Sequence, residues 1–215
     1  MKCKIMSKVS VIIPAFNEEK TVSGIVSICR ESKYVSEVIV VDDGSIDQTS
    51  KVAEQVCAKV IREEINKGKT YAMLRGSNEA KEKILLFLDA DLIGLDVTHV
   101  NSLIEPIING NADSTLGVFV GGRFRTDLAH AITPFLSGQR CMKKELFLSA
   151  VNSLDLRYGI EITLSKYFAK AELKILKVPL CNVTHVMKEE KTGKGRGILD
   201  RAKMYGEIFL ALFRK

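Results

Sequence analysis

Short apolar runs alternate with segments of helical spacing along most of this chain. Residues 9–13 (VSVII) and 84–88 (ILLFL) are typical of buried strands, and residues 21–31 place apolar side chains three and four positions apart. Strands that alternate with helices favour an α/β fold, with a mostly parallel sheet flanked by helices. We therefore predict a single domain over residues 1–215. The expected strands are Val9–Ile13, Glu37–Val41, Lys59–Arg62, Ile84–Leu88, Ser114–Val120 and Lys174–Val178. The expected helices are Thr21–Glu31, Gln48–Val56 (capped by Asp47), Lys69–Ala80, Thr98–Asn109 (ended by Gly110), Lys143–Ala150, Gly159–Lys170 and Ile198–Phe213.

Composition narrows the class of protein. Hydrophobic residues make up 46% of the 215 residues and charged residues 27%, which is ordinary for a globular domain. The net charge of +6 suits an anionic ligand or an acidic membrane surface, and no nucleic-acid recognition motif is present. The five cysteines are widely spaced and form no C-x-x-C pair, which favours reduced thiols and a cytoplasmic protein. No apolar run reaches the ~20 residues that a membrane span needs, and the N-terminal pattern does not fit a signal peptide.

Two carboxylates follow the most apolar strand. Asp89 and Asp91 stand one residue apart just after residues 84–88. In an open α/β sheet, ligands bind beyond the carboxyl ends of the strands, and paired carboxylates are good ligands for Mg²⁺ or Mn²⁺. A lone D-x-D is also compatible with an ordinary solvated loop, so the other strand ends decide between the two interpretations.

Polar residues also follow the other early strands. The segments IIPAFNEE, VVDDGS and NKGKT lie at the ends of the first and second strands and at the start of a helix. Free backbone N–H groups and a lysine at a helix start can meet phosphate. Parallel strands bring their carboxyl ends to one edge, so these segments and the Asp89–Asp91 segment predict a nucleotide site there.

These four motifs, in this order over residues 8–95, resemble the family 2 glycosyltransferases of GT-A fold, which include dolichol-phosphate mannose synthase. The resemblance implies a nucleotide-diphosphate-sugar donor and a divalent metal, Mg²⁺ or Mn²⁺. It implies that Asp43 contacts the base, that Lys69 lies near the nucleotide, that Asp89 holds the ribose or the metal side and acts in catalysis, and that Asp91 binds the metal. The other residues implied to line the donor site are Pro14, Ala15, Phe16, Glu18, Gly44 and Ala90.

The second half resembles glucosyl-3-phosphoglycerate synthase and its relatives, through GGRFRT, YGIEITL and VTHVM in that order. The resemblance implies an acceptor segment at Arg123 and Thr126, a catalytic Glu161 and a metal-binding His185. The chain departs from that pattern by an extra residue between Arg123 and Thr126 and by Val186-Met187 after His185. An anionic acceptor also favours Arg140 as an acceptor-binding residue, because arginine binds phosphate and carboxylate with two hydrogen bonds.

Each of these later residues also has an interpretation that involves no function. Glu161 is also a favourable first-turn acid of a helix, His185 an ordinary loop histidine, and the arginines solvated surface charges. The segment Lys188–Gly197 resembles a mobile lid, and the helix Ile198–Phe213 either packs on the domain or lies on a membrane surface.

The predicted function is a metal-dependent hexosyltransferase that moves a sugar from a UDP- or GDP-linked donor to an anionic acceptor. Residues 1–95 would bind the nucleotide sugar and residues 96–215 the acceptor. A phosphoglycerate acceptor and a polyprenyl-phosphate acceptor stay open, as do a homodimer, peripheral contact with the inner face of the membrane, and a non-catalytic nucleotide-sugar-binding protein. A nucleotidyltransferase is disfavoured because IIPAFNEE lacks a glycine-rich signature.

Overall fold

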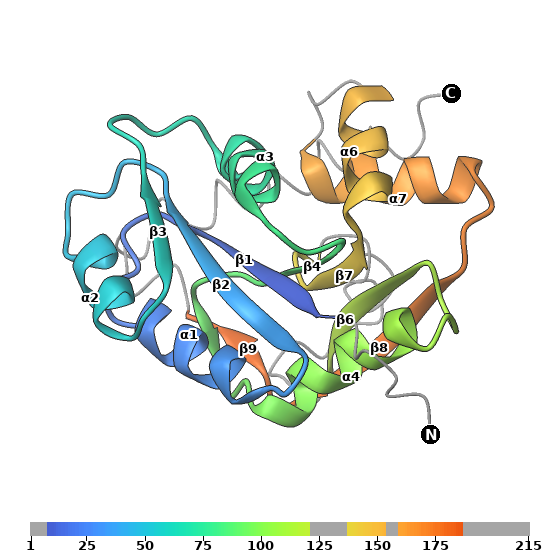
Figure 1. Cartoon of the computed structure of the whole chain (residues 1–215), viewed down its shortest axis with the longest axis horizontal. Coiled ribbons are helices and arrows are strands. Elements are labelled where there is room, and N and C mark those ends of the chain that lie inside the picture. Colours follow the sequence, from blue (N-terminus) through green and yellow to red (C-terminus); the bar gives the residue numbers. More distant parts are fainter. Residues whose placement is uncertain (1–7, 121–136, 154–158, 187–215) are drawn as a thin grey trace, which may run out of the picture.

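The computed structural model describes residues 8–120, 137–153 and 159–186 of the protein. Fifteen strands and helices lie in these ranges (Figure 1). The strands are β1 (Val9–Ala15), β2 (Val35–Asp42), β3 (Lys59–Arg62), β4 (Ile84–Phe87), β5 (Leu92–Ile93), β6 (Ser114–Val120), β7 (Arg140–Lys143), β8 (Ile175–Cys181) and β9 (Thr184–His185). The helices are α1 (Val22–Glu31), α2 (Thr49–Gln55), α3 (Lys69–Glu79), α4 (Val97–Ile108), α6 (Lys144–Ser153) and α7 (Ile160–Lys170).

Seven of the described strands form one mixed, mostly parallel sheet in the order β3-β2-β1-β4-β7-β6-β8. The pairs β1–β2, β1–β4, β2–β3 and β6–β8 are parallel, whereas β7 runs antiparallel to both of its neighbours. The predicted α/β sheet with flanking helices is therefore confirmed. β7 was missed, because its sequence RCMK has no apolar run, and the expected helix from Lys143 begins one residue later.

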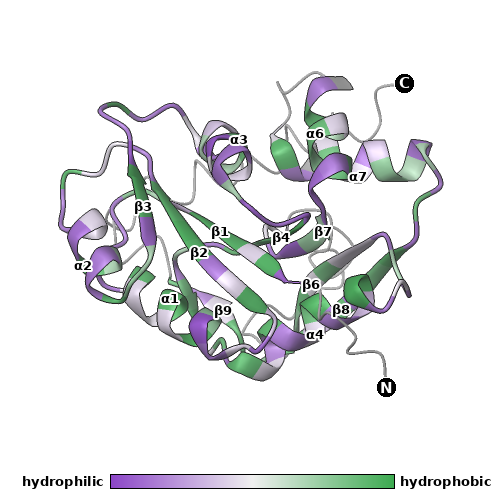
Figure 2. Ribbon diagram, in the orientation of Figure 1, coloured by the Kyte–Doolittle hydropathy of each residue, from purple (hydrophilic) through white to green (hydrophobic). Residues whose placement is uncertain are grey.

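Two apolar cores lie on opposite faces of the sheet, which explains why its central strands have almost no polar positions. Val11 and Ile13 of β1 pack toward α1 and α4, whereas Ile12 packs toward α3, α6 and α7. Successive strand residues point to opposite faces, so a strand covered on both sides must be apolar throughout. Figure 2 shows the apolar stretches along the central strands, and Figure 1 shows the two helical layers.

Most helix boundaries lie within two residues of the prediction. Pro106 lies inside α4, and Gly110 follows the helix end with a positive φ of 70°, as expected for a residue that ends a helix. The capping prediction for α2 was one position off: Gln48 precedes the helix and makes no side-chain cap. Asp47 nevertheless accepts a hydrogen bond from the Thr49 N–H at 2.9 Å.

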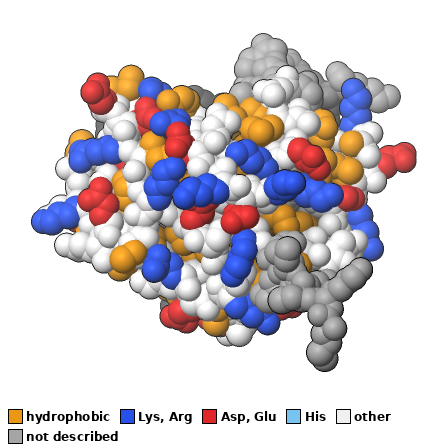
Figure 3. All heavy atoms as spheres, in the orientation of Figure 1, with side chains coloured by type: hydrophobic (Ala, Val, Ile, Leu, Met, Phe, Trp, Pro, Cys, Tyr) orange, Lys and Arg blue, Asp and Glu red, His pale blue; other side chains and the backbone are white. Residues whose placement is uncertain are grey.

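Several predictions fall outside the described residues: the acceptor residues Arg123 and Thr126, the segment Lys188–Gly197 and the helix Ile198–Phe213. Among the helices in the described ranges, none combines the length and the apolar character needed to cross a bilayer. On the face shown in Figure 3, basic side chains alternate with acidic ones and no broad acidic patch is present.

Candidate active site

The exit of β4 lies at the point where the strand order of the sheet reverses. β1 pairs with β2 on one side and with β4 on the other, and the Leu88 N–H still donates to the Ile12 carbonyl at 3.2 Å. The chain then leaves the sheet through Asp89, Ala90 and Asp91. Such a reversal opens a crevice at the carboxyl ends of the strands, which is where ligands bind in open α/β sheets.

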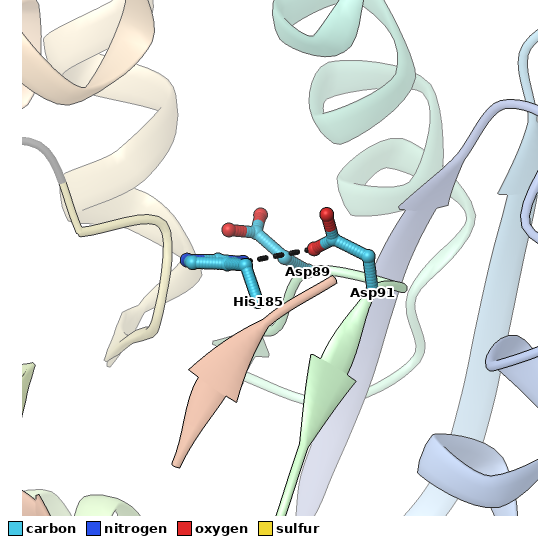
Figure 4. A group of neighbouring side chains, drawn as sticks. All are labelled: Asp89, Asp91 and His185. Carbon is cyan, nitrogen blue, oxygen red and sulfur yellow. Dashed lines mark hydrogen bonds and ion pairs between the residues drawn. The ribbon is translucent and has the colours of Figure 1, made fainter. Parts of the chain in front are cut away.

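Asp89, Asp91 and His185 gather in this crevice, with one potential ligand atom from each within 4.8 Å of the others (Figure 4). The His185 Nδ1 lies 2.9 Å from the Asp91 Oδ1. Two carboxylates and an imidazole match the preferences of Mn²⁺, and the carboxylates those of Mg²⁺, so the donor set fits the predicted metal. Burial alone would lower the pKa of His185, but the Asp91 hydrogen bond and the charges of Asp89 and Asp91 raise it above its ordinary value.

A two-stranded sheet outside the main one brings His185 to Asp91. Leu92 of β5 pairs with His185 of β9, and the Val186 N–H donates to the Asp91 carbonyl at 3.0 Å. Gly94 has a φ of 79°, and a Cβ added there would lie 2.4 Å from the Asn182 carbonyl oxygen. Neither strand was predicted, because two-residue strands carry no periodic pattern.

Lys69 connects two acids that are far apart in the sequence. Its Nζ lies 2.7 Å from the Asp89 Oδ1 and 2.7 Å from the Glu161 Oε1. Burial by itself lowers the pKa of Lys69, but the two carboxylates outweigh it and raise that pKa above its usual value. The same lysine and the charge of His185 keep the pKa of Asp89 below its usual value in spite of burial. At neutral pH the lysine is therefore a cation between two carboxylates.

The turn before Lys69 is fastened to the end of β2. Asp43 is buried, and its two oxygens accept hydrogen bonds from the Lys67 N–H (2.9 Å) and the Gly68 N–H (2.7 Å). Gly68, with a φ of 93°, directly precedes α3, which has no side-chain cap at its start. The predicted contact of Asp43 with a base stays a prediction, and the carboxylate already positions the helix start.

The loops after β1 and β2 are fastened to each other as well. The Asp43 N–H donates to the Ala15 carbonyl at 2.9 Å, and the Glu18 N–H donates to the Thr49 hydroxyl at 2.8 Å. Gly44 has a φ of 79°, and a Cβ there would lie 2.8 Å from the Asn66 nitrogen. The loop after β3, which contains Asn66, therefore packs against the loop after β2. Phe16 remains 45% exposed at this edge. Four of the predicted donor-site residues thus lie on loops that hydrogen bonds and close packing hold together: Phe16, Glu18, Asp43 and Gly44.

Arg140 does not lie where an exposed acceptor residue would. It is 1% exposed, and its Nη2 donates to the Ser165 hydroxyl of α7 at 2.7 Å. Its neighbour Gln139 was not predicted, is fully buried, and donates from Nε2 to the Asp89 Oδ2 at 2.9 Å. A single sequence has no signal for this role, because a polar residue in a loop is usually solvated. Direct acceptor contact by Arg140 gains no support from this placement.

A pocket of about 460 Å³ opens beside Lys69 and Glu161, between the first turns of α3 and α7. Gly159 precedes α7 with a φ of 80°, and like Gly68 it makes no side-chain cap. Uncapped helix starts leave N–H groups available to hydroxyl or anionic groups of a ligand. The residues that line the pocket are Lys67, Gly68, Lys69, Thr70, Tyr71, Leu74, Gly159, Ile160 and Glu161.

Residues 10–161, more than half of the chain, match the model of the family described as glycosyl transferase family 2. The chain belongs to this family. The match confirms the predicted family and includes every described candidate site residue except His185.

Two named glycosyl-transferring enzymes and a solved structure resemble this chain. Dolichol-phosphate mannosyltransferase of Pyrococcus furiosus is 36% identical over 125 residues, which cover 54% of this chain and 33% of that protein. Glucosyl-3-phosphoglycerate synthase of Mycobacterium tuberculosis is 29% identical over 194 residues, covering 73% and 59%. A crystal structure of the latter with Mn²⁺, UDP-glucose and phosphoglyceric acid has a TM-score of 0.70 and 27% identity, covering 94% of this chain and 80% of that one. The chain spans half or less of the length of several curated relatives.

Proposed function

We propose that this family 2 protein transfers a sugar from a nucleotide-diphosphate sugar to an anionic acceptor with the help of Mg²⁺ or Mn²⁺. The observation that carries the proposal is the placement of Lys69 between Asp89 and Glu161, next to the Asp89–Asp91–His185 group. This arrangement combines a cation for a diphosphate, a metal-binding set and a carboxylate that faces a pocket large enough for a sugar.

Each described residue then has a separate task. Asp91 and His185 would hold the metal, with Asp89 beside them. When bound, a divalent ion neutralises charge on the leaving diphosphate. Lys69 would hold a phosphate oxygen, and the interlocked loops of Pro14–Glu18 and Asp43–Gly44 would hold the nucleoside. Glu161 would accept a hydrogen bond from a sugar or acceptor hydroxyl and so orient it for attack.

A test of the donor reaction needs no knowledge of the acceptor. We expect slow hydrolysis of a UDP- or GDP-sugar that depends on Mg²⁺ or Mn²⁺ and is lost in excess chelator. Asp91→Ala should abolish hydrolysis and Mn²⁺ binding, while Glu54→Ala, which removes an exposed acid on α2, should change neither. Hydrolysis at the full rate in chelator would contradict the proposal. Nucleotide-sugar binding without turnover of any donor or acceptor would favour a non-catalytic binding protein.

The net charge of +6 supports an anionic acceptor, and two relatives point to acceptors that contain phosphate. The crystallised synthase holds phosphoglyceric acid, and the Pyrococcus relative is named for dolichol phosphate. An enzyme for a soluble acceptor should turn over 3-phosphoglycerate and ignore anionic vesicles. An enzyme for a lipid acceptor should bind those vesicles in a salt-sensitive way, and deletion of residues 198–215 should weaken that binding. Turnover of neutral sugars alone would contradict the charge argument.

A cytoplasmic location accords with the cysteines of the described residues, Cys29, Cys57, Cys141 and Cys181, which are all free thiols. Contact with the inner face of a membrane is left to the vesicle experiment.

A further inference from the structure

The segment from Ser137 to Arg140 lies beside the site and leads into β7, which is antiparallel to both of its neighbours. β7 is antiparallel to β4, so Arg140, its first residue, pairs with Phe87 at the carboxyl end of β4. On the other side, the Gly117 N–H of β6 donates to the Gln139 carbonyl at 2.8 Å. Strand pairing therefore fixes the backbone of Gln139 and Arg140 directly beside the exit of β4.

Gln139 holds one oxygen of Asp89. Its Nε2 lies 2.9 Å from the Asp89 Oδ2, while its Oε1 accepts a hydrogen bond from the Ser137 hydroxyl at 2.8 Å. An ionised carboxylate only accepts hydrogen bonds, so the amide nitrogen, not the oxygen, must face Asp89. Because Lys69 binds the Oδ1 at 2.7 Å, both oxygens of Asp89 are held, each by a different side chain.

Gly138 makes this approach possible. A Cβ at this position would lie 2.6 Å from the Asp89 Oδ1 and 2.6 Å from the Lys69 Nζ. Any side chain there would therefore separate the lysine from the carboxylate. The glycine and the glutamine together explain why the segment can lie against the site without filling it.

Arg140 is tied to the start of α7. Its Nη2 donates to the Ser165 hydroxyl at 2.7 Å, and that hydroxyl donates to the Glu161 carbonyl at 2.8 Å. Burial lowers the pKa of Arg140 to about 10, and the charge of Glu161 partly offsets that effect, so the guanidinium stays charged at neutral pH. Among the described side chains, only the Arg140 Nη1 is buried without a hydrogen-bond acceptor.

A buried cation with an unmet donor is unfavourable for stability, since desolvation of a charge costs several kcal/mol. A sequence selected for stability alone would place an apolar residue at position 140, as β7 has at Cys141 and Met142. Departures from local consistency of this kind concentrate at functional sites. The contact with the Glu161 turn gives Arg140 a task that an apolar residue could not perform.

We propose that Gln139 and Arg140 are positioning residues of the transfer reaction, Gln139 for the Asp89 carboxylate and Arg140 for the turn that carries Glu161. This inference rests on the proposed function. The two side chains are consecutive in the sequence, yet they reach different elements, because neighbouring residues of an extended chain point in opposite directions. One short segment thereby fixes the relative position of two carboxylates that are 72 residues apart (89 to 161).

Gln139→Leu tests the first half, because leucine fills similar space and donates no hydrogen bond. We expect UDP affinity at saturating Mn²⁺, measured by titration calorimetry, to fall about 10–100-fold, the usual effect of removing a group that orients a metal-site ligand. The matched control is Ser10→Ala near the amino end of β1, away from the site. It removes a buried hydroxyl that donates to the Glu37 carboxylate at 2.6 Å, so it should lower stability but leave UDP affinity unchanged. Unchanged UDP affinity in Gln139→Leu, or an equal loss in Ser10→Ala, would overturn the assignment.

Arg140→Met and Arg140→Lys test the second half by a different readout. Glu161 lies outside the metal-binding group, so UDP affinity should stay within about twofold of the wild type, while kcat for sugar transfer falls at least about tenfold with little change in donor KM. Lysine keeps the charge and should restore part of kcat; it also serves if the methionine variant fails to fold. A fall in UDP affinity as large as that of Gln139→Leu would overturn the separate roles. The calorimetric arm requires no turnover, so absence of any transferase activity would refute the proposed function without deciding the role of Gln139.

Discussion

Gly94 offers a direct test of the idea that the β5–β9 pair holds His185 in place. In Gly94→Ala, the new Cβ would lie 2.4 Å from the Asn182 carbonyl oxygen, inside the 3.0 Å that real Cβ contacts essentially never pass. The obstacle is backbone, so no rotation of a side chain relieves it. The φ of 79° adds a penalty of about 1–2 kcal/mol for any residue with a Cβ.

Overpacking typically costs about 1–3 kcal/mol, so the two effects together disfavour the paired form by about 3 kcal/mol. The protein can escape this penalty by separating Gly94 from Asn182, which breaks the pairing of Leu92 with His185. If only the paired form binds metal, a penalty of this size weakens binding by up to two orders of magnitude, about tenfold for each 1.4 kcal/mol. We expect at least tenfold weaker Mn²⁺ binding, followed by the electron paramagnetic resonance signal of free Mn²⁺.

Gly110→Ala is the matched control. Gly110 also has a positive φ, 70°, but a Cβ there meets no atom within 4 Å, and the residue lies at the far end of α4. This variant should lose about 1–2 kcal/mol of unfolding free energy in urea and bind Mn²⁺ as the wild type does. Equal Mn²⁺ affinity in Gly94→Ala and Gly110→Ala would refute the reasoning that the small sheet positions His185.

Two further predictions concern other parts of the site and the fold. Asp43→Ala leaves the Lys67 and Gly68 N–H groups without their acceptor, so unfolding free energy should fall by about 1–3 kcal/mol and UDP affinity should fall with it. In Asp113→Ala, a single N–H group, that of Lys174, loses its acceptor, and this hydrogen bond is exposed. This variant should lose less unfolding free energy than Asp43→Ala and keep its UDP affinity. A larger loss in Asp113→Ala than in Asp43→Ala would contradict the role of Asp43. Asp96 caps α4 through the Thr98 and His99 N–H groups, and the Thr98 hydroxyl and these N–H groups hold its pKa below the usual value. A carboxyl group whose pKa is lower in the folded than in the unfolded state stabilises the fold at a pH above its ordinary pKa. That stabilisation is lost as the pH falls through the lowered pKa. Asp96→Ala should therefore cost about 0.5–2 kcal/mol at pH 7 and progressively less as the pH falls below the ordinary carboxyl pKa, and a pH-independent difference in urea midpoint would argue against the cap.

The sequence was sufficient wherever a local pattern decides the structure. The apolar runs at β1 and β4 and the helical spacing of α1 predicted the sheet, and acids at strand ends predicted the position of Asp89 and Asp91. The residues next to Asp89 and Asp91 in the sequence were enough to predict where these two acids lie. The helix start at Lys69 was predicted for the same reason, since it follows a glycine, while the place of Lys69 near a nucleotide stays a prediction.

Features decided by distant partners could not be predicted. Arg140 is charged, and charged residues are rarely buried, so its contact with Ser165 of α7 had no sequence signal. β7 owes its strand structure to β4 and β6, which supply hydrogen bonds on both sides, rather than to its own residues. β5 and β9 are each two residues long, and 90 residues separate them in the sequence, so only the three-dimensional structure reveals that they pair.

The position of His185 also has a consequence for how the chain becomes active during synthesis. Asp91 and His185 are 94 residues apart, so the Asp91–His185 contact is among the most non-local in the site. A growing chain forms the ends of β1, β2 and β4 long before residue 185 leaves the ribosome, and non-local contacts form late in any case. Such an intermediate would have the nucleoside edge but an incomplete ligand set. If Asp91 and His185 hold the metal as proposed, stalled chains of increasing length should acquire Mn²⁺ affinity abruptly once β9 can pair with β5.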